Sequence, residues 1–289
     1  MSNAIVSIVY GDDLTYYQGA KFSLLSFLAN CPENGQPNVY VLTEKPDFFS
    51  DLPFTVFPIS REQKADWTCD GKYHFRIKNR GLKYIIGVIP ESVDKFLFFD
   101  ADTHFKPTSA ALFEMISAEK AVLFYPETNI YNVNESSEYG KLKGKEITLS
   151  DGGLYSLTPS STMWNSGVIG VSRSMMSNID YADNLILGMM ELDCQAHTIE
   201  QFALSEALVR DFQLSPAREY VNDYSTSGQK NWARIVLQRF FEENGDKPFE
   251  EQVELAKTLS FRRPLSEVIK GHIYKKKKKL RKLFGLPEE

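Results

Sequence analysis

One short stretch constrains this chain more than any other: the apolar run Phe96 to Phe99 is followed at once by Asp100, Ala101 and Asp102. A run that is apolar at every position is typical of a strand buried on both faces of an α/β sheet. Ligands of open α/β sheets bind beyond the carboxyl ends of the strands, which is where the two aspartates fall. Two carboxylates separated by a small residue suit a divalent cation and the phosphates that it holds. The stretch therefore predicts chemistry on a phosphorylated substrate.

Composition and charge narrow the class of protein. The 289 residues are 43% hydrophobic and 25% charged, as in a globular protein, and no apolar run approaches the roughly 18 residues of a membrane span. Three scattered cysteines are too few for a disulfide framework or a zinc site, and the first residues lack the basic and apolar parts of a secretory signal. We therefore expect a cytoplasmic protein.

Strand-like and helix-like segments alternate along most of the chain. Strands are expected at residues 4–10, 38–43, 54–59, 95–99, 121–125 and 163–171, the last interrupted at 165–167, and helices at 15–29, 78–88, 174–191 and 198–211. The polar segment 128–159 is too long for a routine connection, so it is expected to be functional or mobile. This order predicts a nucleotide-binding α/β fold over residues 1–224 and a helical extension over residues 225–289.

The extension ends in a polybasic tail. Between Lys270 and Lys282 there are eight lysines or arginines and no acidic residue, although the whole chain has a net charge of -5. The run Lys275 to Lys279, followed by leucine and phenylalanine residues, is typical of a segment that binds an anionic membrane surface. A disordered solubilising tail is the alternative, and the acidic remainder of the chain argues against nucleic-acid binding. The tail would place the protein at the inner face of the membrane.

Two enzyme classes use a pair of aspartates after a buried strand. In sugar-nucleotide transferases the pair binds a metal that bridges the diphosphate of the donor. In phosphohydrolases of the haloacid-dehalogenase type, the first aspartate attacks phosphorus and the second acts as acid and base. That class also needs a later lysine and a GDxxxD-like acidic pair, and neither follows Asp102 in recognisable form. An ordinary capping turn is the interpretation without function.

Five segments, in order, carry a resemblance to a known family. They are IVSIVYGDD (5–13), a basic helix before the aspartates, KFLFFDADT (95–103), WNSGVIGV (164–171) and IEQFALSEAL (199–208). Together they resemble the GT-A fold glycosyltransferases, most of all family 8 and related nucleotide-diphospho-sugar transferases. The resemblance implies a mixed GT-A sheet flanked by helices. It also implies transfer of a sugar from a nucleotide diphosphate donor, expected to be a UDP-sugar, to a hydroxyl of a cell-surface glycan or glycolipid.

The resemblance assigns the metal and the diphosphate to the aspartate pair. Asp100 and Asp102 are expected to bind Mn²⁺ or Mg²⁺ against the diphosphate, with Ala101 also in contact with the donor. A C-terminal histidine often completes the metal ligands in the family, which makes His272 the candidate third ligand. His104 is a rival because it lies close to Asp102 in sequence, and a free surface histidine is the alternative for both.

The base is expected to lie against the first turn of the chain. By resemblance, Tyr10, Gly11 and Asp12 contact it, with Asp12 accepting a hydrogen bond from an N–H of the base. A carboxylate suits an N–H donor, and glycine lets a base approach the backbone closely. A plain β-turn is the alternative, since glycine and aspartate are common in turns.

Two further segments are expected to bind the diphosphate and the donor sugar. Lys78 and Arg80, on a predicted helix, match the family's basic residue; a solvated basic face is the alternative, since positions 76, 80 and 83 share one side of that helix. Asn165 and Ser166 match the residues that contact the sugar. A β-bulge is the alternative there, because glycine follows them within a strand.

The reacting carbon is expected to lie near Glu200 and Gln201. The resemblance places one of them on the reacting face of the sugar, with their roles unresolved, whereas a capping box from Thr198 to Gln201 is the alternative. Asp151 and Tyr155 in the segment 128–159 are expected on the acceptor side or in a lid. A non-catalytic transferase fold that acts as a membrane-surface scaffold is the competitor that is not an enzyme.

Overall fold

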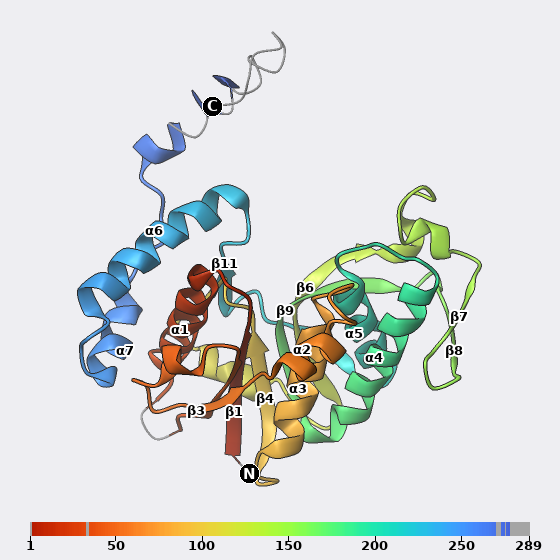
Figure 1. Ribbon diagram of the computed structural model, residues 1–289, viewed down its shortest axis with the longest axis horizontal. Coiled ribbons are helices and arrows are strands. Elements are labelled where there is room, and N and C mark those ends of the chain that lie inside the picture. Colours follow the sequence, from red (N-terminus) through yellow and green to blue (C-terminus); the bar gives the residue numbers. More distant parts are fainter. Residues whose placement is uncertain (1, 33–34, 270–272, 275, 278–289) are drawn as a thin grey trace.

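The computed structural model describes residues 2–32, 35–269, 273–274 and 276–277, apart from the side chain of Ser227. The chain forms three layers, in which a seven-stranded sheet lies between two layers of helices (Figure 1). The sheet consists of β1 (Ser2–Val9), β2 (Asn38–Thr43), β3 (Thr55–Pro58), β4 (Val93–Phe99), β6 (Lys120–Asn129), β9 (Thr162–Ser172) and β10 (Gln213–Pro216). Two short pairs lie outside it, namely β5 (Thr103–Phe105) with β11 (Val221–Asp223), and β7 (Glu146–Thr148) with β8 (Leu154–Ser156).

α-Helices pack on both faces of the central sheet. They are α1 (Leu14–Leu28), α2 (Arg61–Trp67), α3 (Arg76–Val88), α4 (Met176–Glu191), α5 (Ile199–Val209), α6 (Ser227–Asn244) and α7 (Phe249–Thr258). None of the helices in the described part of the chain is long and apolar enough to cross a membrane.

The order of the strands creates a place for a ligand. The sheet runs β10-β6-β9-β4-β1-β2-β3, and β4, β1, β2 and β3 are parallel to one another. β9 is antiparallel to both of its neighbours, β4 and β6. From β1 the chain moves first outward to β2 and β3 and then back to β4 on the other side of β1. The carboxyl ends of β1 and β4 therefore flank the switch point, where open α/β sheets bind their ligands.

The strand that precedes the aspartates is buried on both faces, as predicted. Phe96 and Phe98 belong to the core shared with α3, α4 and α5, whereas Leu97 and Phe99 belong to the core shared with α1 and α6. Each of the four side chains is at most 2% exposed. Burial of a side chain of this size contributes about 1.5–3 kcal/mol, so β4 is a rigid support for the residues that follow it.

The last two helices pack on the N-terminal half of the chain. α6 and α7 lie beside α1 (Figure 1), and Ala233, Leu237 and Phe240 of α6 are buried in the α1 core. The ring of Phe240 meets the ring of Phe22 edge-on at 5.5 Å. This packing brings the start of α6 over the carboxyl end of β4.

The polar segment 128–159 has secondary structure of its own. It begins as the end of β6 and contains short 3₁₀ turns and the β7–β8 hairpin, which packs on α4. Apolar side chains that recur within it are buried and anchor it, namely Ile130, Tyr139, Leu142, Ile147 and Leu149. The next strand, β9, is not interrupted at 165–167 as expected, but its pairing with β6 shifts register between Asn165 and Ile169, in agreement with the β-bulge alternative.

Candidate functional site

The turn after β4 is held in place by three other elements. The Asp100 N–H donates to the carbonyl of Gly167 in β9 at 2.8 Å, and the Tyr224 hydroxyl donates to the carbonyl of Ala101 at 3.0 Å. From α1, Gly19 faces the same carbonyl so closely that a Cβ on it would lie 2.3 Å from the oxygen. The two aspartates therefore stand on a turn whose backbone is fixed from three sides.

Lys78 of α3 joins the turn to α5. Its ammonium lies 3.1 Å from Asp100 Oδ1 and 3.0 Å from Glu200 Oε1, and it donates to Ser166 Oγ at 3.1 Å. Ser166 Oγ in turn donates to Glu200 Oε1 at 2.6 Å. Burial alone would lower the pKa of Lys78, but the carboxylates of Asp100 and Glu200 outweigh it and raise that pKa above its usual value. The structure thus brings four of the predicted site residues into one ionic cluster.

A second cluster is built on Glu127, which sequence reasoning missed. Its two carboxylate oxygens accept hydrogen bonds from Asn165 Nδ2 at 2.7 Å and from Gln201 Nε2 at 2.8 Å. The amide oxygens of the same two side chains accept from the backbone N–H groups of Gly167 and Ser166, respectively. Glu127 therefore fixes the orientation of both predicted amides. The signal in the sequence was an acidic residue near the end of the strand that pairs with β9.

Asp102 lies in a crowded acidic environment. Its Oδ2 is 3.6 Å from the ammonium of Lys230 at the start of α6. Burial raises the pKa of Asp102, and the charges of Asp100 and Asp223 raise it further, while Lys230 opposes them. Lys230 and Asp223 were also missed, because they come from the far end of the chain and reach the turn only through the packing of β11 and α6.

The aspartate pair fits a divalent cation that arrives with a phosphate. Asp100 and Asp102 offer hard oxygen donors. Burial and the neighbouring charges of Asp100 and Asp223 raise the pKa of Asp102, and a cation would neutralise that negative charge. Within the described residues, no three His, Cys, Asp or Glu side chains are grouped to hold a metal by themselves. Mg²⁺ is commonly bound through one or two carboxylates together with substrate phosphates, and this donor set meets that requirement.

The two candidate histidines do not complete this set in the described structure. His272 lies outside the described residues. His104 Nε2 lies 3.2 Å from Asn222 Nδ2, and its ring packs at 4.8 Å against that of Phe261. Burial lowers the pKa of His104 to about 4, so the ring is neutral at physiological pH.

The turn after β1 lies at the other side of the switch point. The Gly11 N–H donates to Glu44 Oε2 at 2.6 Å, and the Tyr10 hydroxyl donates to the carbonyl of His74 at 3.2 Å. The side chain of Asp12 is exposed, and its carbonyl accepts from Lys45 Nζ at 3.3 Å. Glu44 therefore holds the backbone of the predicted base-binding turn, and the side chain of Asp12 faces solvent.

The structure separates Arg80 from Lys78. Arg80 pairs with Asp66 at 3.3 Å and with Asp183 at 3.5 Å, and Arg76 binds the same Asp183 at 2.7 Å. The helix face that carries positions 76 and 80 thus meets acidic side chains of α2 and α4, while Lys78 points to Asp100 and Glu200. The contacts made by Arg80 give it a structural role between these helices.

The predicted acceptor-side residues are tied to other helices. Asp151 Oδ2 accepts from Asn184 Nδ2 of α4 at 2.8 Å, and the Tyr155 hydroxyl donates to Glu206 Oε2 of α5 at 2.6 Å. Both residues belong to the region of the β7–β8 hairpin, at the opposite end of the molecule from α7 (Figure 1). Their side chains are engaged in attaching that hairpin to the helices.

Comparisons with known proteins add no assignment to this geometry. No known family model matches the chain, and no curated protein matches its sequence.

Proposed function

We propose that this chain is a metal-dependent glycosyltransferase of the GT-A type. It would move a sugar from a nucleotide diphosphate donor, a UDP-sugar by resemblance, to a hydroxyl of a glycan or glycolipid. The observation that carries the proposal is the contact of Lys78 with both Asp100 and Glu200. Through this contact one side chain joins the turn that we propose binds phosphate to the residues that we propose react, beside the switch point of a mixed sheet, and this proximity supports the proposal.

The donor's charged part is assigned to the turn after β4. Asp100 and Asp102 would hold Mn²⁺ or Mg²⁺, and that cation would supply neutralisation of the departing diphosphate. Lys78 and Lys230, each already paired with one of these aspartates, bring further positive charge to the same place. Fixed positive charge where negative charge develops is commonly the largest electrostatic contribution to catalysis. The turn of Tyr10, Gly11 and Asp12 is assigned to the base.

The reacting sugar is assigned to the surface between β9 and the start of α5. Glu127 holds the amides of Asn165 and Gln201, and Glu200 is held by Ser166 and Lys78. Side chains fixed in this way present hydrogen-bonding groups without first losing conformational freedom. Glu200 and Gln201 remain assigned to the reacting carbon, with Glu200 the better nucleophile of the two.

A thermal-shift screen with nucleotide sugars tests this function. UDP, GDP and a set of their sugar conjugates are added with and without Mn²⁺; a ligand at 100 times its Kd stabilises the native state by about 2.7 kcal/mol. Asp102→Asn should abolish the Mn²⁺-dependent shift, and Asp94→Asn, at the opposite end of the same strand, should retain it. The proposal fails if no nucleotide sugar stabilises the protein or if both variants respond as the wild type does.

The same material tests the competing functions. Transfer of phosphate from p-nitrophenyl phosphate to Asp100, detected by mass spectrometry, with no effect of nucleotide sugars, would assign the chain to the phosphohydrolases. Absence of both ligand binding and hydrolysis would support the non-catalytic scaffold.

We propose that the C-terminal end contacts an anionic membrane surface. Exposed apolar side chains recur there, at Leu265, Ile269, Ile273 and Tyr274. Leu265 and Ile269 are four positions apart in a helical segment and therefore lie on one face of it, and exposed lysines follow at 276 and 277. Lys275, Lys278 and Lys279 lie outside the described residues.

Vesicle flotation tests the membrane contact. The full chain should float with phosphatidylglycerol vesicles and not with phosphatidylcholine vesicles, and Ile269→Asp should weaken that binding. Val209→Asp changes an equally exposed apolar residue of α5 and serves as the matched control. Equal binding to both vesicle types, or equal loss in both variants, would contradict the contact.

A further inference from the structure

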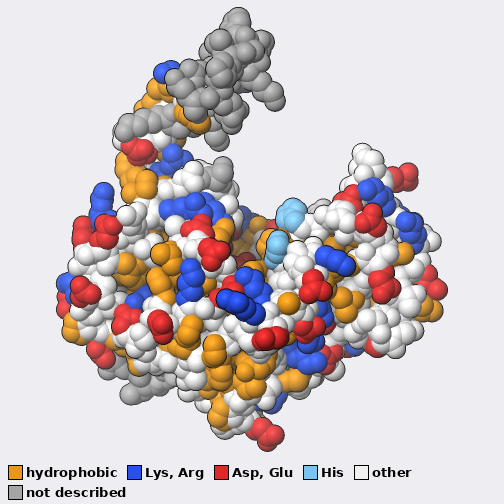
Figure 2. All heavy atoms as spheres, viewed as in Figure 1, with side chains coloured by type: hydrophobic (Ala, Val, Ile, Leu, Met, Phe, Trp, Pro, Cys, Tyr) orange, Lys and Arg blue, Asp and Glu red, His pale blue; other side chains and the backbone are white. Residues whose placement is uncertain are grey.

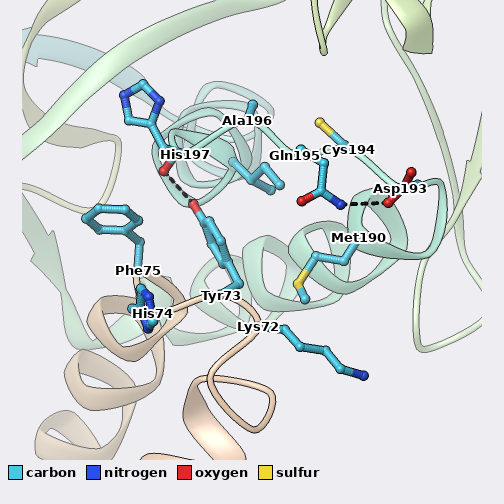
Figure 3. A pocket seen from close by; sticks show the side chains of 11 residues that line it. Lys72, Tyr73, His74, Phe75, Met190, Asp193, Cys194, Gln195, Ala196 and His197 are labelled. Atoms are coloured by element: carbon cyan, nitrogen blue, oxygen red, sulfur yellow. Dashed lines mark hydrogen bonds between the residues drawn. The ribbon is translucent and has the colours of Figure 1, made fainter.

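A pocket of about 480 Å³ opens between the segment before α3 and the segment that joins α4 to α5 (Figure 3). Small-molecule sites in proteins have volumes of roughly 300–1,000 Å³, so the pocket has room for a small ligand. Figure 2 shows a hollow in the molecular surface, and histidine side chains lie at its edge. None of the roles assigned above uses this pocket.

The wall of the pocket is hydrogen-bonded to the proposed active site. The Tyr73 hydroxyl accepts from the Glu200 N–H at 2.8 Å and donates to the carbonyl of His197 at 3.0 Å. The Tyr10 hydroxyl donates to the carbonyl of His74, another lining residue. A ligand in the pocket would therefore lie next to the residues assigned to the reacting carbon rather than to an unrelated face.

The lining combines an exposed aromatic ring with polar side chains, two of which are hydrogen-bonded to each other. Phe75 is 42% exposed and lies toward the same end of the pocket as His197, whereas Asp193 lies toward the other end (Figure 3). Gln195 Nε2 donates to Asp193 Oδ1 at 2.6 Å, which presents an amide and a carboxylate together. An exposed aromatic ring offers an apolar platform, and the amide and carboxylate offer partners for hydroxyl groups.

The balance of charge indicates a neutral ligand. Lys72 and Asp193 carry opposite charges in the lining, so the pocket shows no excess that would select a phosphate or a carboxylate. A pyranose ring matches this chemistry, since one face is made of C–H groups and the rim of hydroxyls. A lipid chain would bury the charged side chains of Lys72 and Asp193 against hydrocarbon, which is costly.

We propose that this pocket binds a neutral pyranose of the acceptor glycan, so that its hydroxyl meets the donor sugar near Glu200. The inference rests on the proposed transferase function and deepens it by naming the class of acceptor. Phe75 supplies the platform for the ring, and Gln195, which is held by Asp193, contacts its hydroxyls.

Methyl NMR on the full chain tests the pocket locally. The chain has seven methionines, and Met190 lines the pocket, so its ¹³C-labelled ε-methyl signal can be assigned with Met190→Leu. Methyl β-glycosides of galactose, glucose and N-acetylglucosamine are titrated in the presence of UDP and Mn²⁺. At least one glycoside should move the Met190 signal in a saturable way.

Substitutions in the lining sharpen the test. Phe75→Ala and, separately, Gln195→Ala should each weaken glycoside binding about tenfold, the equivalent of losing one well-made contact. Tyr131→Ala removes a comparably exposed aromatic ring outside the pocket and should leave binding unchanged. Unchanged affinity in both lining variants, or no glycoside that moves the Met190 signal, would overturn the proposal.

The outcomes separate this inference from the proposed function. Stabilisation by UDP with Mn²⁺ and no response of Met190 to glycosides would overturn the pocket alone. A glycoside response without any stabilisation by nucleotides would overturn both the transferase function and the acceptor assignment. Both responses together, with the predicted loss in Phe75→Ala, support the proposal.

Discussion

The ammonium of Lys78 lies 3.0 Å from the carboxylate of Glu200, which is only 3% exposed. This ion pair links α3 to the first turn of α5 and, through Asp100, to the end of β4. Removal of the cation that pairs with a buried carboxylate strongly destabilises a fold, because the carboxylate charge is then left without compensation. The pair therefore couples the stability of the fold to the geometry of the candidate site.

Replacement of Lys78 by methionine should lower the free energy of unfolding by about 3–5 kcal/mol, since the charge of Glu200 is then unpaired. The double variant Lys78→Met with Glu200→Gln should recover a large part of that loss, because the buried charge of Glu200 is then removed as well. Urea unfolding of the four proteins in the cycle measures the coupling. Strictly additive losses would show that the contact contributes nothing to stability.

Gly19→Ala should displace the turn that carries the two aspartates. The added Cβ would lie 2.3 Å from the carbonyl oxygen of Ala101, a distance that forces α1 or the turn to move. We expect a lower melting temperature and loss of Mn²⁺-dependent binding of UDP. Gly87→Ala in α3 is the matched control, because nothing lies within 4 Å of its Cβ. It should stabilise the helix by up to about 1 kcal/mol.

Glu127→Ala should lower the rate of sugar transfer far more than it weakens donor binding. Loss of the carboxylate frees the amides of Asn165 and Gln201, and a small misplacement at a reacting centre can cost about a hundredfold in rate. UDP-sugar turnover gives kcat, and calorimetry gives the Kd of UDP, which should not change. Glu119→Ala, immediately before the start of β6, is the control. Equal losses in both variants would remove the positioning role.

Glu44→Gln should destabilise the protein in a pH-dependent way. Burial alone would raise the pKa of Glu44, but its bonds to the Gly11 N–H and to Lys64 outweigh burial and lower that pKa. A carboxyl whose pKa is lower in the folded state stabilises the fold above its ordinary pKa, and this contribution is lost as the pH falls through the folded-state value. The difference from wild type should therefore be about 1 kcal/mol at pH 7 and shrink below about pH 4. Unfolding in urea across this range measures it, and a constant difference would contradict the assignment.

Arg80→Gln should leave nucleotide binding unchanged, in contrast to substitution of Lys78. Its guanidinium pairs with Asp66 and Asp183, and its side chain is 28% exposed, so we expect a loss of stability below about 1 kcal/mol. Calorimetric titration with UDP and Mn²⁺ compares the two variants. Weaker binding in Arg80→Gln would return this residue to the donor site.

Much of the central sheet could be predicted from local pattern. The apolar run of β4 identified a strand buried on both faces, and the long helices were found to within a few residues because their apolar periodicity extends over several turns. The short strands β5, β10 and β11 and the helix α2 were missed, since three to seven residues carry too little periodicity to distinguish them from loops. The tertiary contacts of these elements, rather than their own sequences, stabilise them.

The sequence by itself determined which residue types end each strand, and so the candidate pairs Asp100 with Asp102 and Glu200 with Gln201. Only the tertiary structure decided that Lys78, and not Arg80, meets Asp100, because spacing on a helix defines shared faces but not which face meets the sheet. It also decided that Glu127, Lys230 and Tyr73 border the site. Each of them contacts a partner that is distant along the sequence. Such contacts exist only once β6, α6 and the segment before α3 have packed around the switch point of the sheet.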